Sequence, residues 1–356
     1  MGAISKIQWT DATWNPVRGC SRISEGCRNC YAERQAARFA GAGETDQSGE
    51  VVLSAGPFHT FAEMTPSGPR WTGKVELVES MLDAPLRWRK PRRVFVNSMS
   101  DLFHESLPDE VIDRVFSIMS GCRQHTFQIL TKRAERMAKY MRRFKPDGRG
   151  WVTPGGEDAE LTHCPVDAAW WPMRNVWLGV SVEDQQSADA RIPHLLQTPA
   201  ALRFVSYEPA LGPVNFDSDE MEGLHALGCG DSDCKTRDKI PGCHGLDWLI
   251  VGGESGPNAR PFDIAWARQI IAQCKAAGVP CLVKQLGACP WDSASSDIDH
   301  LFQACGHPCD CCDECPSNEG QRARKEHPQP LVLNDRKGGE PAEWPEDLRV
   351  REMPAC

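Results

Sequence analysis

Short apolar runs rich in β-branched residues recur along the chain, and polar or glycine residues follow each of them. Continuous apolar runs of this length are typical of strands buried on both faces of a sheet. We expect up to eight such strands, at Ile7–Thr10, Lys74–Leu77, Val94–Asn97, Phe127–Thr131, Val176–Ser181, Arg203–Ser206, Trp248–Val251 and Cys281–Lys284.

Segments with helical spacing of apolar residues lie between several of these runs, at 109–122, 132–144 and 263–278. The last of them ends in Gly278, a plausible helix C-cap, shortly before Pro280. Strands that alternate with helices imply a parallel sheet. We therefore predict an α/β protein with a TIM-like (β/α) barrel, complete or partial, that carries cysteine-rich insertions. A doubly wound open sheet is the alternative.

Polar residues follow almost every predicted strand. In a parallel barrel the chemistry takes place at the carboxyl ends of the strands. Four charged residues at these ends are candidates for positioning or proton transfer, although each could equally form a salt bridge within the barrel: Lys132, Glu183, Glu208 and Lys284. The full set of polar strand ends is Asp11, Trp14, Asn15, Asn97, Ser98, Asp101, Thr131, Lys132, Ser181, Glu183, Ser206, Glu208, Gly252, Gly253, Glu254, Lys284 and Gln285.

Four stretches interrupt the alternation and have the composition of loops or insertions. We expect a barrel over residues 1–290 with insertions at 40–70, 146–175 and 216–245, a cysteine-rich metal-binding insertion at 291–330, and a C-terminal tail at 331–356 that packs on the barrel.

The composition suits one large domain or two ordinary ones, with 356 residues of which 40% are apolar. No apolar run approaches the ~18 residues that a membrane span needs, and the N-terminus lacks the apolar stretch of a signal peptide. We therefore expect a cytoplasmic protein that does not bind membranes. Seventeen cysteines in that compartment indicate metal binding rather than disulfides.

Three cysteines near the N-terminus, Cys20, Cys27 and Cys30, follow the first predicted strand with the spacing Cys-x6-Cys-x2-Cys. Three thiolates on one loop can hold three irons of a [4Fe–4S] cluster and leave the fourth iron open for a ligand. A structural zinc site normally has four protein ligands, and no cysteine or histidine lies between Cys30 and His59. An open cluster is the better local interpretation, although a distant fourth ligand would also allow zinc.

A second group of cysteines lies in two of the predicted insertions. The pair Cys312-x2-Cys315 has the spacing of a zinc knuckle. The group is expected to bind either zinc or a second iron–sulfur cluster, with a pairing that the sequence leaves open: Cys229, Cys234, Cys243, Cys309, Cys311, Cys312 and Cys315. Three further cysteines, Cys122, Cys274 and Cys281, lie in apolar patterns and are predicted to belong to the core.

The net charge of −9 argues against nonspecific binding of polyanions, but the charge is unevenly distributed. Basic residues surround Trp88 and recur between Lys132 and Arg149. Such stretches can bind phosphates, and they are also found as solvated helix faces.

The chain resembles the phage-associated three-Cys-motif family of unknown function, which is described as radical-SAM-like, over most of its length. Its first cysteine gap is six residues, whereas radical S-adenosylmethionine enzymes usually have three. The matching segments are KIQWTDATWNPVRGC, GCRNCYAE, VNSMSDLFHE, LTKRAER, WLGVSVEDQ, VSYEPALGP, DWLIVGGESGPNARP, VKQLG and DRKGGEPAEWPEDLRVREMP.

The resemblance implies that Cys20, Cys27 and Cys30 bind a [4Fe–4S] cluster and that S-adenosylmethionine chelates its open iron. Reduction, by a protein such as flavodoxin or ferredoxin, would then yield a 5′-deoxyadenosyl radical that abstracts hydrogen from a substrate. Gly252–Gly253–Glu254 has the composition of the motif that holds the methionine ammonium, but it follows a late strand, so a substrate or loop role is also open. Further candidates for cofactor contacts are Tyr31, Asn97 and Ser181.

Two classes of function remain at this stage. The first is a radical S-adenosylmethionine enzyme that acts on a nucleic acid or nucleotide. The alternative is a noncatalytic, zinc-stabilised protein that binds nucleic acid. A barrel hydrolase lacks support, because the sequence has no nucleophile elbow, no His-Glu-x2-His and no phosphate-binding loop.

Overall fold

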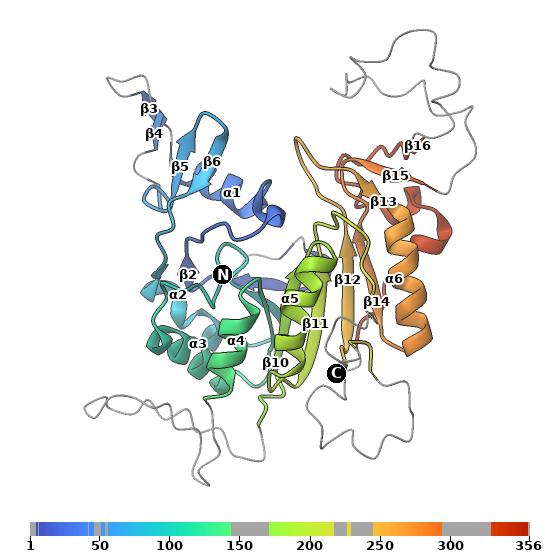
Figure 1. Cartoon of the computed structure of the whole chain (residues 1–356). Coiled ribbons are helices and arrows are strands. Elements are labelled where there is room, and N and C mark those ends of the chain that lie inside the picture. The colour runs from blue at the N-terminus through green and yellow to red at the C-terminus, as the bar shows by residue number, and fades with distance from the viewer. Residues whose placement is uncertain are drawn as a thin grey trace.

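The computed structural model describes residues 5, 7–41, 43–45, 51–53, 56–143, 171–216, 226–228, 245–293 and 329–354. Its centre is a curled, fully parallel sheet of seven strands (Figure 1). The strands lie side by side in chain order: β1 (Ala12–Trp14), β8 (Arg93–Val96), β9 (Thr126–Thr131), β10 (Val176–Val182), β11 (Leu202–Tyr207), β12 (Trp248–Gly252) and β14 (Cys281–Gln285).

The order of the strands decides between the two predicted folds. Each connection steps to the next position in the same direction, whereas a doubly wound sheet reverses its direction at one point. The partial TIM-like barrel is therefore confirmed, and the doubly wound alternative is wrong. Among the described strands β1 and β14 are the two edges and do not pair with each other, so the barrel is open.

Four helices cover the outer face of the curled sheet (Figure 1). Their buried residues form one large apolar core with the outward side chains of the strands. The helices α3, α4 and α6 confirm the three predicted helical segments, and Gly278 caps the last of them at φ 68°. The four are α3 (Asp109–Gly121), α4 (Ala134–Met141), α5 (Gln185–Leu196) and α6 (Ile264–Ala277).

The inner face of the sheet is filled by aromatic side chains toward the amino ends of the strands. Trp9 contacts this cluster from the N-terminal segment, with ring centroids 4.8 Å from Phe95 and 6.2 Å from Phe204 and from Trp248. A Cβ at Gly179 would lie 2.5 Å from the Phe204 ring, so only glycine leaves room for this packing.

The prediction of a strand at Ile7–Thr10 is therefore wrong. These residues form a turn whose apolar character comes from Trp9, and the first strand begins only at Ala12. Asp11 consequently lies before β1, at the amino edge of the sheet, where it pairs with Arg93 at 3.2 Å. It does not belong to the polar carboxyl ends.

The prediction at Lys74–Leu77 is also wrong as a strand of the barrel. Only Glu76–Leu77 is extended, as β7, and it pairs antiparallel with β2 (Val17–Arg18) outside the large sheet. This small ribbon supports the chain between β1 and the three cysteines.

The segment 40–70, predicted as an insertion, contains two antiparallel hairpins that follow α1 (Tyr31–Phe39). Phe61 and Trp71 from the second hairpin and its flanks pack with Ala36 of α1. The hairpin strands are β3 (Gly43–Thr45), β4 (Val51–Leu53), β5 (Ala62–Thr65) and β6 (Gly68–Trp71).

The C-terminal segment runs along the free edge of β14. Val283 N donates to Val350 O at 2.9 Å, and Leu286 N donates to Gly338 O at 2.8 Å. A small sheet and short helical turns complete the described chain: α2 (Glu79–Leu82), η1 (Glu25–Cys27), η2 (Ala84–Arg87), β13 (Phe262–Asp263), β15 (Pro290–Asp292), β16 (Gln329–Pro330), η4 (Pro341–Glu343) and η5 (Glu346–Leu348).

Three of the predicted insertions, at 146–175, 216–245 and 291–330, lie largely outside the described residues. Within the described part of the chain, no helix has the length and apolar character needed to cross a membrane.

Candidate functional site

The three N-terminal cysteines lie on the loop between β2 and α1. Cys27 ends the short turn η1, and Cys30 is the N-cap residue of α1. All three thiols are half-buried and none forms a disulfide. Cys20 and Cys30 also pack against the apolar cluster under α1, which gives one side of the loop a fixed base.

Three hydrogen bonds hold this cysteine loop, residues 20–30, and the start of α1 over the carboxyl ends of the sheet. Ser24 donates to Glu183 Oε1 at 2.8 Å, beyond β10, and Asn29 Nδ2 donates to Glu254 Oε2 at 2.8 Å, beyond β12. The hydroxyl of Tyr31 donates to the Ser98 carbonyl, beyond β8, at 2.5 Å. The loop therefore crosses several strand ends rather than extending from one of them.

Gly26 brings the loop especially close to the sheet. A Cβ at this position would lie 2.2 Å from Glu183 Oε1 and 2.4 Å from its Cγ. Glu183 is buried with only 2% of its side chain exposed, so it cannot swing aside into solvent. Glycine is the residue that allows this approach.

Glu183 is the charged centre beneath the loop. Its carboxylate pairs with Lys132, which also donates to Ser181 Oγ at 2.9 Å, and with Arg191 Nη1 at 2.8 Å. Burial would raise the pKa of Glu183, but Lys132 and Arg191 outweigh it and hold the pKa below its usual value. The carboxylate stays ionised at neutral pH. It binds Ser24 of the loop, Lys132 just after β9 and Arg191 of α5.

Glu254 forms a second buried anchor. Arg260 binds both of its oxygens, with Nη2 to Oε1 at 2.7 Å and Nε to Oε2 at 3.1 Å, and reaches on to the Glu25 carbonyl at 2.9 Å. Burial opposes ionisation here too, but Arg260 and Asn29 keep the pKa of Glu254 below its usual value. Both oxygens of Glu254 are engaged, which favours the loop role considered for the Gly252–Gly253–Glu254 segment.

Arg133 connects Cys20 with the end of β9. Its Nη1 lies 3.0 Å from Asp101 Oδ2 and 3.9 Å from Cys20 Sγ, and its Nη2 donates to Ser21 Oγ at 2.8 Å. The imidazole Nε2 of His104 lies 2.8 Å from the same hydroxyl. A cationic donor therefore faces the sulfur of Cys20.

Burial sets the protonation state of two of the three thiols. Burial and Asp101 raise the pKa of Cys20 to about 12, although Arg133 opposes the shift, and burial raises the pKa of Cys30. Both thiols are therefore protonated at neutral pH, and a metal that bound them would have to displace their protons.

The other two charged candidates form a separate pair. Lys284 Nζ donates to Glu208 Oε1 at 2.5 Å, and Gln285 Nε2 donates to the same oxygen at 3.2 Å. Ser181 links this pair to Lys132, because its hydroxyl donates to the Glu208 carbonyl at 3.0 Å. The four charged candidates thus form two ion pairs: Lys132 and Glu183 follow the adjacent strands β9 and β10, whereas Glu208 and Lys284 join β11 and β14 across the end of β12.

Two further predicted contact positions have unusual surroundings. Asn97 has φ of 59°, and its buried Nδ2 has no hydrogen-bond acceptor among the described residues. Gly253 lies so close to the neighbouring segment that a Cβ would meet Leu286 O at 2.3 Å, whereas Gly252 lies beside Glu208. A strained asparagine with an unsatisfied donor is typical of a ligand-contact position.

Several residues of this network were missing from the predicted site: Ser21, Ser24, His104, Arg191 and Arg260. Ser21 and Ser24 lie between the predicted metal ligands, and Arg191 and Arg260 follow a predicted glutamate by 8 and 6 residues. Their short distance in sequence from a predicted site residue was the signal that could have found them. The seven later cysteines, Cys229, Cys234, Cys243, Cys309, Cys311, Cys312 and Cys315, lie outside the described residues.

The loop offers three thiols, which is a donor set that can hold an iron–sulfur cluster. Over the ranges that the structure describes, no three His, Cys, Asp or Glu side chains are arranged around a single ion position. In a cluster each cysteine binds its own iron, so the three sulfurs surround the group instead of converging on a point. Three free thiols with a cationic donor beside one of them are compatible with that arrangement.

The fold and the polar strand ends define an α/β protein with a half-barrel whose cysteine loop covers the carboxyl ends of the strands. A family model described as "Protein of unknown function (DUF5131)" matches residues 4–339, and the chain belongs to this family. No curated protein and no solved structure matches the chain.

Proposed function

We propose that this protein is an iron–sulfur enzyme of the radical S-adenosylmethionine type. The observation that carries the proposal is the position of the three-cysteine loop, bound through Ser24, Asn29 and Tyr31 to the carboxyl ends of β10, β12 and β8. Active sites of parallel barrels lie at this end. The kinship to a phage-associated, radical-SAM-like three-cysteine family and the cytoplasmic location are parts of the same proposal.

In this proposal Cys20, Cys27 and Cys30 hold a [4Fe–4S] cluster and leave one iron for S-adenosylmethionine. A bound and reduced cluster would supply one electron for the cleavage of S-adenosylmethionine to methionine and a 5′-deoxyadenosyl radical. The electron comes from a reductant protein such as flavodoxin or ferredoxin.

The protein's own residues bind, orient and exclude water. Arg133 donates to Cys20 Sγ and stabilises the negative charge on that ligand. Glu183 and Glu254 hold the loop in place, and the unsatisfied Nδ2 of Asn97 is available to an acceptor on the cofactor. Lys284 and Glu208 are the pair placed to position a substrate or move a proton.

The proposal is tested by anaerobic reconstitution of the full chain, followed by analysis of iron, sulfide and zinc. The account predicts four irons and four sulfides at the N-terminal loop, and formation of 5′-deoxyadenosine from S-adenosylmethionine after reduction. Bound zinc with no iron and no 5′-deoxyadenosine would contradict the proposal and support the noncatalytic, zinc-stabilised nucleic-acid-binding protein.

A further inference from the structure

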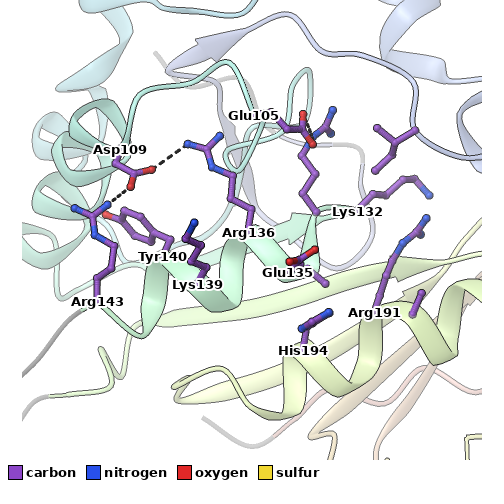
Figure 2. Close-up of a pocket in the computed structure, with 14 residues that line it drawn as sticks. Glu105, Asp109, Lys132, Glu135, Arg136, Lys139, Tyr140, Arg143, Arg191 and His194 are labelled. Atoms are coloured by element: carbon purple, nitrogen blue, oxygen red, sulfur yellow. Dashed lines mark hydrogen bonds and ion pairs between the residues drawn. The ribbon is translucent and has the colours of Figure 1, made fainter. Parts of the chain in front are cut away.

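A groove of about 590 Å³ lies between α4 and α5 and adjoins the site described above (Figure 2). One end is lined by Ile23 of the cysteine loop and by Lys132 and Arg191, the two cations that bind Glu183. The other end extends past Lys139 to Arg143. The groove is therefore continuous with the strand ends.

The lining of this groove is cationic although the whole chain carries a net charge of −9. Six lysine and arginine side chains line it against three carboxylates. Arg136 and Arg143 share Asp109, with Arg136 Nη2 at 3.0 Å, so this carboxylate serves two guanidinium groups (Figure 2). Glu183 and Asp101, which lie just outside the lining, pair with three more of the cations, Lys132, Arg191 and Arg133. Lys139 is the cation of the lining with which no described residue forms an ion pair, so a small excess of positive charge remains in the groove.

One hydrogen-bond donor of the groove has no acceptor among the described residues. The Nη1 atom of Arg136 is buried and no described residue accepts a hydrogen bond from it. Lys139 is exposed on α4, and His194 lines the groove from α5 (Figure 2). Leaving a buried charged donor unsatisfied is costly, which indicates that an anionic group completes its hydrogen bonds.

We infer that this groove binds the sugar–phosphate backbone of a single-stranded polynucleotide and leads it toward the strand ends. The inference deepens the proposed function and rests on it for the role of the bound strand as substrate. Arg136, Lys139 and Arg143 distribute positive charge over about two helical turns, ~10 Å, which exceeds the size of one phosphate. A row of phosphates matches such a row of cations.

An acidic protein surface matches the groove less well. Ile23 is the exposed large apolar side chain among the residues that line it, and the positive charges lie in a concave surface rather than on a flat one. A stable protein interface usually buries ~800 Å² on each partner around an apolar centre. A narrow polyanion is the occupant that the charge and the shape favour.

The test is fluorescence anisotropy with a fluorescein-labelled thymidine strand of about 12 nucleotides and the cluster-loaded full chain. Lys139→Glu reverses a charge in the groove, and Lys90→Glu makes the same change in the other basic stretch, where Lys90 is exposed outside the groove. We expect Lys139→Glu to weaken binding by about fivefold or more and to reduce the salt dependence by roughly one unit, with Lys90→Glu within about twofold of wild type.

Three outcomes would overturn the inference. Equal weakening by both variants would show that net charge alone attracts the strand. Thymidine monophosphate that competes as strongly as the strand at equal phosphate concentration would show a site for a single phosphate. Absence of binding by the wild-type protein at about 50 mM salt would also contradict it.

The failure of this inference can be told apart from failure of the proposed function. The same titration is repeated with a Cys20→Ser, Cys27→Ser, Cys30→Ser variant. If the cluster is absent from the protein but the groove is real, strand binding and its loss in Lys139→Glu persist. If the cluster and 5′-deoxyadenosine form but no strand binds, the groove inference fails alone.

Discussion

The two ends of the half-barrel are built from different side chains. Toward the amino ends of the strands, Trp9, Phe204 and Trp248 fill the interior with apolar packing. Toward the carboxyl ends, Glu183 and Glu254 are buried with their cationic partners beneath the cysteine loop. Apolar packing stabilises the fold without any charge, whereas buried ions must be paired to be tolerated. The comparison indicates that one end holds the structure together and the other holds the site.

The largest expected effect is the loss of iron binding when the cysteines of the loop are substituted. Cys20→Ser, Cys27→Ser and Cys30→Ser should each abolish stable binding of iron at the loop while the circular dichroism of the sheet remains, because the thiols lie outside the apolar core of the barrel. Iron analysis after reconstitution measures this. The control is Cys289→Ala, an exposed cysteine outside the loop, which should retain iron.

The opposite end is tested by Trp9→Ala. Removing this buried ring from its contacts with Phe95 and Trp248 should lower the free energy of unfolding by ~3–5 kcal/mol. Iron bound per folded molecule should not change. Denaturant unfolding and iron analysis check the two halves of the prediction, with Trp9→Phe as the milder control. Loss of iron without loss of stability would break the distinction between the two ends.

Glu183→Gln should have a smaller effect on stability, ~2–3 kcal/mol, because it leaves Lys132 and Arg191 buried without their carboxylate. The pKa of Glu183 is lowered in the folded chain. Its contribution to stability is therefore complete above the unfolded value of ~4.3 and is lost as the pH falls through the folded pKa. Unfolding curves between neutral and acid pH should show a shallower acid loss in the variant. An unchanged acid profile would contradict the role assigned to this carboxylate.

Asn29→Ala should produce the smallest change. It removes one charge-assisted hydrogen bond to Glu254, which Arg260 still binds through both oxygens, so a loss of ~1 kcal/mol is expected. Proteolysis within the cysteine loop should become faster while global unfolding changes little. Asn258→Gly is a suitable comparison, because the backbone carbonyl of Asn258 rather than its side chain accepts the other bond from Asn29, and glycine tolerates its φ of 60°.

Much of the fold could be predicted because apolar runs and helical spacing alternate along the chain. Six buried strands and three helices follow this pattern directly, and their alternation implies the parallel sheet. Ile7–Thr10 misled the prediction because a buried turn and a short buried strand have the same apolar character. The turn is distinguished by Trp9, whose position inside the sheet depends on Phe95, Phe204 and Trp248, which are distant in sequence.

The prediction of the site was limited in the same way, because contacts between residues distant in sequence decide its arrangement. Lys132, Glu183, Glu208 and Lys284 were recognisable as charged residues after strands. Their division into two pairs depends on which strand ends are neighbours in space. The contacts of Ser24 with Glu183 and of Asn29 with Glu254 join residues 159 and 225 positions apart. Periodicity carries no information on such contacts, so the attachment of the loop to the sheet had to come from the structure.

The most direct test of the account is electron paramagnetic resonance of the anaerobically reconstituted, reduced full chain, recorded with and without S-adenosylmethionine, beside the Cys30→Ala variant. The account predicts a [4Fe–4S]⁺ signal that changes shape when S-adenosylmethionine binds the open iron and that is absent from the variant. A colourless protein without this signal, or a cluster signal that S-adenosylmethionine leaves unchanged, would contradict the proposed open-iron site.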